Sequence, residues 1–139
     1  MNTCDYLEQV RRLDAEIRFR EDEIAALRTR ADGVRSVRFG QTKIKSSGTD
    51  DRLDAILDRI DGLIAEQREA VCRLQEKITE ISYEITRLKD LDEAVCLTYR
   101  YVRLLPWSEI ADAMGLSERH LRRIRDRGVR HLEEMRGKY

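Results

Sequence analysis

The stretch WSEIADAMGLSERHLRRIRDRGVRHL, residues 107–132, decides the fold of the C-terminal third of this 139-residue chain. Ile110 and Met114 recur at helical spacing and predict a short helix over 107–114. Gly115 follows, and glycine readily takes the left-handed conformation that closes a helix. Ser117 is a favoured N-cap residue, so the next helix is predicted over 117–133. Two helices joined by so short a turn form a helix-turn-helix.

The helix predicted over 117–133 separates an apolar face from a charged one. Its inward face carries Leu121, Ile124, Gly128 and Leu132, and its outward face carries Glu118, Arg119, Arg122, Arg123 and Asp126. Six arginines and one acid lie between Arg119 and Arg130, although the whole chain balances 27 basic against 27 acidic residues. This local basic face favours double-stranded DNA as the partner, because it complements the phosphate charge. The alternative is an arginine-rich face that is merely solvated.

One more helix is predicted ahead of this motif, over residues 91–102. Its inward candidates are Ala94, Val95, Leu97, Thr98, Tyr101 and Val102. Pro106 ends the pattern, because proline is excluded from a helix interior but fits just ahead of a new helix.

The longest regular pattern is a heptad stripe between residues 53 and 88. Its members alternate at steps of four and three: Leu53, Leu57, Ile60, Ile64, Gln67, Val71, Leu74, Ile78, Ile81, Ile85 and Leu88. Branched residues at heptad position a, with leucines at several d positions, favour a two-stranded coiled coil. Gln67 either fixes the register of this stripe or is an ordinary tolerated polar position.

The residue pattern of the N-terminal part predicts an amphipathic helix followed by a loop. Apolar residues at helical steps predict a helix from Asp5 to about Ala31: Tyr6, Val10, Leu13, Ile17, Ile24 and Leu27, with one step missing at Arg20. Residues 33–50 are rich in Gly, Ser and Thr and predict a mobile loop, with a short hairpin as the alternative. The basic residues of this loop are Arg35, Arg38, Lys43 and Lys45. We interpret it as a connector, the alternative being an arm that follows nucleic acid.

Three packings satisfy the heptad stripe. The N-terminal helix folds back on it as an intrachain hairpin, or two copies of the stripe pair across a homodimer axis, or two hairpins form a four-helix bundle. A homodimer through 53–88 is preferred, because the stripe is longer than a small core requires.

Together these patterns predict an all-α protein with two regions. Residues 1–90 form a helical hairpin or coiled-coil oligomerisation region, and residues 91–139 form a helix-turn-helix DNA-binding domain. Charged residues make up 39% of the chain and aromatic residues 6%, which suits exposed helices. No apolar run is long enough to cross a membrane and no signal peptide is evident, so a cytoplasmic location is expected.

Catalysis and metal binding are not expected. Cys4, Cys72 and Cys96 are dispersed, without ligand spacing, and are interpreted as reduced thiols. His120 and His131 lie on one predicted helix without further ligands. No nucleophile motif, phosphate loop or acid pair is evident, so the protein is not expected to be an enzyme or to need a cofactor.

The stretch EIADAMGLSERHLRRIRDRGVRHL, residues 109–132, resembles the region 4 helix-turn-helix of bacterial sigma factors. There a short helix with EIA precedes LG or MG, a capping serine and the recognition helix; His120 departs from the usual threonine. The layout of the whole chain resembles small phage-encoded late transcription regulators, including ArpU-like proteins. No counterpart of sigma region 2 is recognisable, so a complete sigma factor is not expected.

The resemblance implies that the first turns of helix 117–133 enter the major groove. It assigns base reading to Glu118, Arg119, Arg122 and Arg123. It assigns DNA backbone contacts to Arg103, Trp107, Ser108, Arg127 and Arg130. Trp107 is itself more typical of a core or rim aromatic than of a base-stacking residue.

The leading hypothesis is therefore a sequence-specific DNA-binding transcription regulator of phage or prophage late genes, acting as a homodimer. Contact with bacterial RNA polymerase is implied by the resemblance alone. Two alternatives remain: a DNA-packaging subunit similar to a small terminase, and an interaction protein that binds polymerase or a sigma factor.

Overall fold

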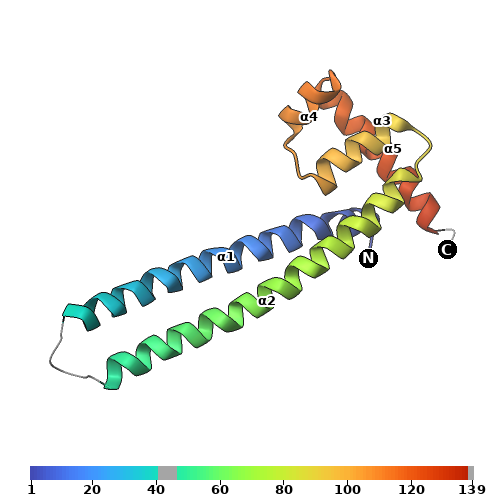
Figure 1. Ribbon diagram of the computed structural model, residues 1–139. Helices are drawn as coiled ribbons and strands as arrows, with labels where there is room; N and C mark the ends of the chain where they lie inside the picture. Colours follow the sequence, from blue (N-terminus) through green and yellow to red (C-terminus); the bar gives the residue numbers. More distant parts are fainter. Residues whose placement is uncertain (41–46, 138–139) are drawn as a thin grey trace. The chain divides into compact units, whose positions relative to one another are not determined.

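The computed structural model describes the backbone of residues 1–40 and 47–137, and the side chains of residues 1–37 and 51–137. Its elements in chain order are α1 (Thr3–Gly40), α2 (Ser47–Thr86), α3 (Leu91–Leu97), the π-helical η1 (Thr98–Val102), α4 (Trp107–Met114) and α5 (Glu118–Gly137) (Figure 1). The described part contains no strand, so the all-α prediction is confirmed. No helix within it is long and apolar enough to cross a membrane.

The chain divides into two compact units. The hairpin unit comprises Ala15–Cys72, and the head unit comprises Met1–Asp14 together with Arg73–Tyr139. Both long helices contribute to both units. The head unit therefore includes residues on either side of the predicted boundary at residue 90.

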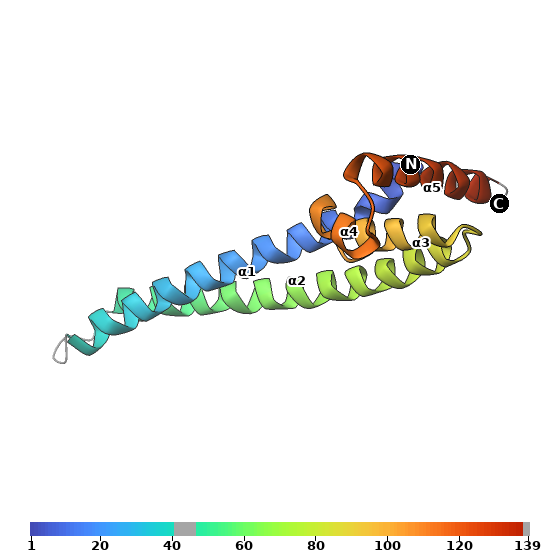
Figure 2. The ribbon, with the colours of Figure 1, turned by 90° about the horizontal axis from the view of Figure 1, so that it is seen from above.

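In the hairpin unit, α1 and α2 lie side by side and run in opposite directions (Figures 1 and 2). Ile24 of α1 packs with Ile60 and Leu63 of α2, and further along Ala31 and Val34 pack with Leu53. The heptad stripe is thus covered by α1 of the same chain, which is the intrachain hairpin among the three packings considered above.

In the hairpin unit, the buried face of α2 does not coincide with the predicted heptad stripe but is shifted to one side of it. Leu53 and Ile60 of the heptad stripe are buried, but so are Leu63 and Ala70, which lie beside the stripe. The other edge of the stripe is half-buried: Leu57, Ile64, Gln67 and Val71. Hence α1 covers one side of the stripe more fully than the other.

Arg20 explains the missing apolar step of α1. Its guanidinium pairs with Glu16 at 2.8 Å and with Glu66 of α2 at 3.5 Å, while its side chain is only 18% exposed. The aliphatic stem takes the place of an apolar residue and the charged end reaches carboxylates, as long basic side chains do at helix interfaces.

The predicted loop at 33–50 is shorter than expected. Helix α1 continues beyond the predicted end near Ala31 to Gly40, and α2 begins at Ser47. The extra turns of α1 are stabilised because Ala31 and Val34 bury against Leu53, continuing the helical spacing of Ile24 and Leu27. Arg35 is an exposed residue of this extension, the side chain of Arg38 is not described, and Lys43 and Lys45 lie outside the described residues.

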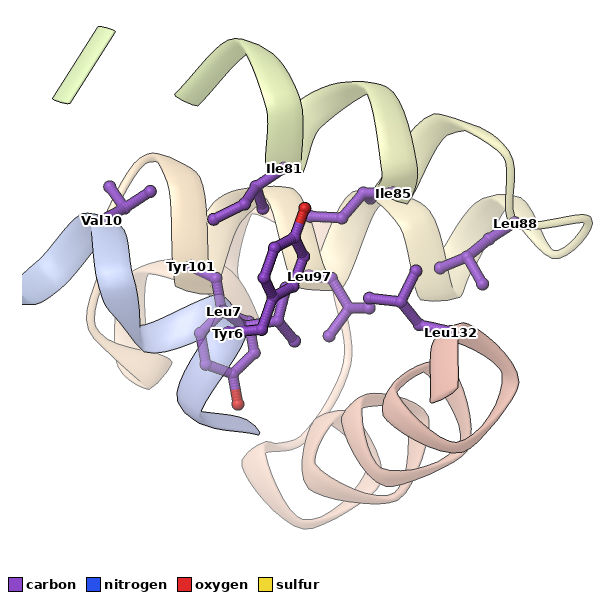
Figure 3. Packing of buried hydrophobic residues seen from close by; sticks show 9 residues of the cluster. All are labelled: Tyr6, Leu7, Val10, Ile81, Ile85, Leu88, Leu97, Tyr101 and Leu132. Atoms are coloured by element: carbon purple, nitrogen blue, oxygen red, sulfur yellow. The ribbon is translucent and has the colours of Figure 1, made fainter. Parts of the chain in front are cut away.

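The core of the head unit joins the start of α1, the middle of the chain and α5 (Figure 3). It contains buried residues from α1, from α2 and the turn after it, and from α3, η1 and α5: Tyr6, Leu7, Val10, Ile81, Ile85, Leu88, Leu97, Tyr101 and Leu132. Burying such side chains contributes roughly 1.5–3 kcal/mol each. The start of α1 is therefore a structural part of the head unit.

A second cluster in the head unit holds α4 against α3 and α5. It contains the buried residues Cys96, Ile110, Leu121 and Ile124. All four residues predicted for the inward face of α5, including Gly128 and Leu132, are buried, which confirms that prediction. Gly128 permits close approach of α5 to α3, because a Cβ there would lie 3.1 Å from Leu97 Cδ1 and 3.3 Å from Glu93 Cβ.

The helix predicted over 91–102 is present, but its second half is a π-helix, which the sequence pattern did not predict. The chain changes to a π-helix at Thr98, and Leu104 adopts a left-handed conformation with φ of 57°. Backbone hydrogen bonds of 2.9 Å close this turn, from Arg103 N–H to the Thr98 oxygen and from Leu105 N–H to the Tyr99 oxygen. The wide turn thus supplies hydrogen-bond donors to the Thr98 and Tyr99 carbonyl oxygens. Pro106, which follows, has no N–H and could not donate such a bond.

Candidate nucleic-acid interface

The turn between α4 and α5 has the geometry that the sequence predicts. Gly115 has φ of 66°, and its N–H donates to the Ala111 oxygen at 2.8 Å. Ser117 Oγ accepts a hydrogen bond from His120 N–H at 3.2 Å, as an N-cap does. The turn therefore fixes the direction in which α5 leaves α4.

The four residues predicted to read bases lie together on the first two turns of α5. Glu118, Arg119, Arg122 and Arg123 are all exposed. Arg119 and Arg123 are four residues apart and so lie one above the other on the helix surface. Within the described part of the chain, none of the four has a hydrogen bond or ion pair, so their charged groups are available to a partner.

The residues predicted to contact the DNA backbone divide between two places. Arg127 and Arg130 are exposed on α5, where they line a shallow hollow with His120, Arg123 and Asp126. Arg103 and Ser108 are exposed on either side of Pro106. The guanidinium carbon of Arg103 lies 5.3 Å from the centroid of the Tyr99 ring, within the range of a cation–π contact.

Trp107, the remaining predicted backbone contact, is half-buried and packs against the α3–α4–α5 cluster. Two guanidinium groups lie over its ring, that of Arg100 at 4.7 Å from the centroid and that of Arg125 at 5.4 Å. The interpretation of Trp107 as a core or rim aromatic agrees with this position.

Arg125 differs from the other arginines of α5. Its Nε donates to Asp126 at 2.7 Å, and its side chain also hydrogen-bonds Tyr101 of η1. Burial raises the pKa of Tyr101, which keeps the hydroxyl protonated and neutral. Arg125 therefore ties α5 to η1 and α4 and is a positioning residue of this interface.

Arg100 is the functional residue that the sequence pattern missed most clearly. Its Nη1 donates to the Leu105 oxygen at 3.2 Å, which supports the turn before α4. Burial lowers the pKa of Arg100, and the nearby positive charge of Arg11 lowers it further. The only sequence signal for this role of Arg100 was its position next to Tyr101, which the helical pattern predicts to face inward.

A polar contact between the buried Glu93 and the exposed His131 supports the C-terminal half of α5. Glu93 of α3 is 1% exposed, and its Oε1 lies 2.7 Å from His131 Nδ1. A carboxylate so deeply buried requires such a partner. His131 thus serves as the partner of Glu93, and the described residues bring no group of three ligands together around either histidine.

Cys96 is buried beneath the same interface, and its Sγ–H donates to the Leu121 oxygen at 3.7 Å. Burial raises the pKa of this thiol to about 11. Cys4 and Cys72 are exposed. Cys96 is therefore a structural thiol of the α3–α5 contact.

An exposed basic helix that follows a left-handed glycine and a capping serine defines a DNA-binding helix-turn-helix. Residues 90–134 match the family described as Sigma-70, region 4. This segment therefore matches the sigma region 4 helix-turn-helix, a DNA-binding domain. Comparisons with curated proteins and with solved structures gave no match.

Proposed function

We propose that this protein is a sequence-specific DNA-binding transcription regulator that reads the major groove with α5. The observation that carries the proposal is the exposed group Arg119, Arg122 and Arg123 on the first turns of α5, directly after the capped turn. A bidentate arginine contact to guanine contributes about 1–3 kcal/mol of discrimination against another base. Glu118 completes the proposed base-reading group.

The proposed backbone contacts surround this group. Arg127 and Arg130 continue the basic face of α5, while Arg103, Trp107 and Ser108 lie around the start of α4. Contacts of this kind fix orientation on the duplex and supply salt-dependent affinity without reading sequence.

The proposed assembly is a homodimer in which two hairpins form a four-helix bundle. It is supported by the half-buried edge of the heptad stripe, Leu57, Ile64 and Val71, which α1 leaves partly uncovered. A dimer presents two recognition helices to half-sites one or more helical turns apart.

The biological setting follows from the resemblance of the layout. We place the protein in the cytoplasm of a bacterial cell or phage-infected host, as a regulator of phage or prophage late genes. The region 4 match supports RNA polymerase as a further partner.

The test is selection of fragments of the source genome by the purified protein at moderate salt, followed by sequencing. A regulator enriches a site upstream of a late or lysis operon. Enrichment beside a terminase gene and away from any promoter would instead favour a packaging role. No enrichment at any salt would contradict DNA recognition and favour binding to polymerase.

A double variant then tests the base-reading assignment. Arg122→Ala with Arg123→Ala is expected to abolish enrichment of the site, because both exposed guanidinium groups are removed. Arg52→Ala with Arg59→Ala, at exposed positions of α2, makes the same change of charge away from α5 and should retain the site. Site selection by the folded Arg122/Arg123 variant would exclude these residues from base reading.

A further inference from the structure

The start of α1 lies against η1 in the head unit. Leu7 and Val10 belong to the same buried cluster as Tyr101, and Figure 3 shows Leu7 and Tyr101 close together. Arg11 follows Val10, and Arg100 precedes Tyr101. The two guanidinium groups lie close enough for the charge of Arg11 to lower the pKa of Arg100.

Arg11 has more hydrogen-bond donors than its neighbours satisfy. A guanidinium has five N–H donors. Arg11 Nε pairs with Glu8 at 3.3 Å, whereas its Nη2 is buried without a hydrogen-bond partner among the described residues. The side chain is nevertheless 42% exposed. Because part of the side chain is exposed, an incoming anion can reach Arg11 from solvent, although not at the buried Nη2.

This basic pair continues the proposed backbone contacts. Arg100 lies over the ring of Trp107, the first residue of α4. Arg103 is exposed three residues further along the chain. Arg11 and Arg100 therefore form one basic patch where α1 meets η1, with Glu8 as its nearby acid, and Arg100 extends this patch to Trp107 at the start of α4. The patch is positively charged and borders the proposed DNA-binding surface, so duplex phosphate is the anion that fits its position.

We propose that Arg11, supported by Arg100, contacts a phosphate of the DNA backbone beside α4. The N-terminal helix is then part of the DNA-binding surface, although it lies outside the segment that matches sigma region 4. The inference rests on the proposed function, because it assigns Arg11 to the same complex.

The test compares the wild type with Arg11→Gln and Arg12→Gln. Arg12 provides a matched control: it is the adjacent residue of α1, is 66% exposed and pairs with Asp5 at 3.5 Å. Each variant loses one positive charge at neighbouring positions. The measurement is fluorescence anisotropy of two labelled duplexes of about 24 base pairs, one with the selected site and one with mixed sequence. Salt is varied between roughly 50 and 200 mM, the range over which counterion release is readily measured.

Loss of one phosphate contact has a defined signature. Arg11→Gln is expected to reduce the slope of log K against log salt by about 0.9 and to weaken binding about fivefold at 150 mM salt. The loss should be equal for both duplexes, because a phosphate contact does not read sequence. Arg11→Lys should retain most of the slope, which distinguishes lost charge from lost packing.

The outcomes separate this inference from the proposed function. Failure of the wild-type protein to bind either duplex contradicts the proposed function itself. Binding by the wild type with equal slopes for Arg11→Gln and Arg12→Gln overturns only the assignment of Arg11. An Arg11→Gln variant that binds DNA normally but loses affinity for RNA polymerase would reassign the patch to an acidic protein surface.

Discussion

At the scale of single residues, Gly128 is the one described glycine at which an added Cβ would meet other atoms within 4 Å. A Cβ there meets Leu97 Cδ1 at 3.1 Å and Glu93 Cβ at 3.3 Å, and both neighbours are buried. Gly128→Ala should lower the free energy of unfolding of the head unit by about 1 kcal/mol, because overpacking outweighs the helix propensity that alanine gains. Urea unfolding followed by Trp107 fluorescence measures this change.

Gly62 provides the control for Gly128. It lies in the interior of α2, and no atom would approach its Cβ within 4 Å. Gly62→Ala should therefore stabilise the hairpin unit by roughly 0.5–1 kcal/mol, as measured by circular dichroism. Equal stabilisation by both substitutions would mean that Leu97 moves aside without cost.

Cys96 gives a residue-scale prediction about reactivity and pH. At pH 8 an aromatic disulfide reagent should modify Cys4 and Cys72 quickly, since both are exposed, and Cys96 only after unfolding. Burial raises the pKa of the Cys96 thiol from 9.0 to about 11, so the folded protein holds this proton more tightly than the unfolded chain. The corresponding stability is present below pH 9 and is lost as the pH rises towards 11. Rapid reaction of all three thiols in the native protein would contradict the burial of Cys96.

At the scale of elements, the start of α1 supports the helix-turn-helix. Leu7 is fully buried in the cluster that contains Leu97, Tyr101 and Leu132. Leu7→Ala should destabilise the head unit by about 2–5 kcal/mol, whereas Phe19→Ala, at a position 62% exposed, should change stability little. Thermal unfolding followed by Trp107 fluorescence compares them. Equal melting temperatures for the Leu7→Ala and Phe19→Ala variants would show that the head unit does not depend on the Leu7 contact of α1.

The helix-turn-helix was predictable because its signals are local. Gly115 and Ser117 mark the two helix ends, and the spacing of Leu121 and Ile124 fixes which arginines of α5 remain exposed. The partner of the heptad stripe was not predictable, because α1 and a second copy of α2 satisfy the same spacing. The end of α1 was underestimated because Ala31 and Val34, within a polar segment, bury only through their contact with Leu53.

The supporting residues of the candidate interface escaped sequence analysis for a different reason. Arg100, in the π-helical η1, and Arg125, in α5, meet over the ring of Trp107. The residue spacing of a regular α-helix does not predict such a π-helical turn. Likewise, Glu93 and His131 belong to different helices, and their pairing depends on the close approach at Gly128.

At the scale of the whole molecule, the half-buried edge of the heptad stripe bears on assembly. Ile64→Glu introduces a charge at this edge, so the proposed four-helix bundle should dissociate into monomers while the helix content stays unchanged. Sedimentation velocity and circular dichroism test this together. Glu69→Ala, at an exposed position of α2, provides a control that should remain dimeric. A wild-type protein that is already monomeric would contradict the homodimer.

The head unit joins the earliest and latest helices of the chain. Leu7 and Leu132 share one buried cluster, and the guanidinium of Arg136 lies 3.7 Å from the centroid of the Tyr6 ring. During translation α1 therefore leaves the ribosome long before its partner in α5 has been made. A polypeptide that terminates before Glu118 contains the hairpin but lacks α5, the helix needed to close the head unit. Such incomplete products should not occupy DNA sites, because assembly of the reading surface requires synthesis to proceed through α5.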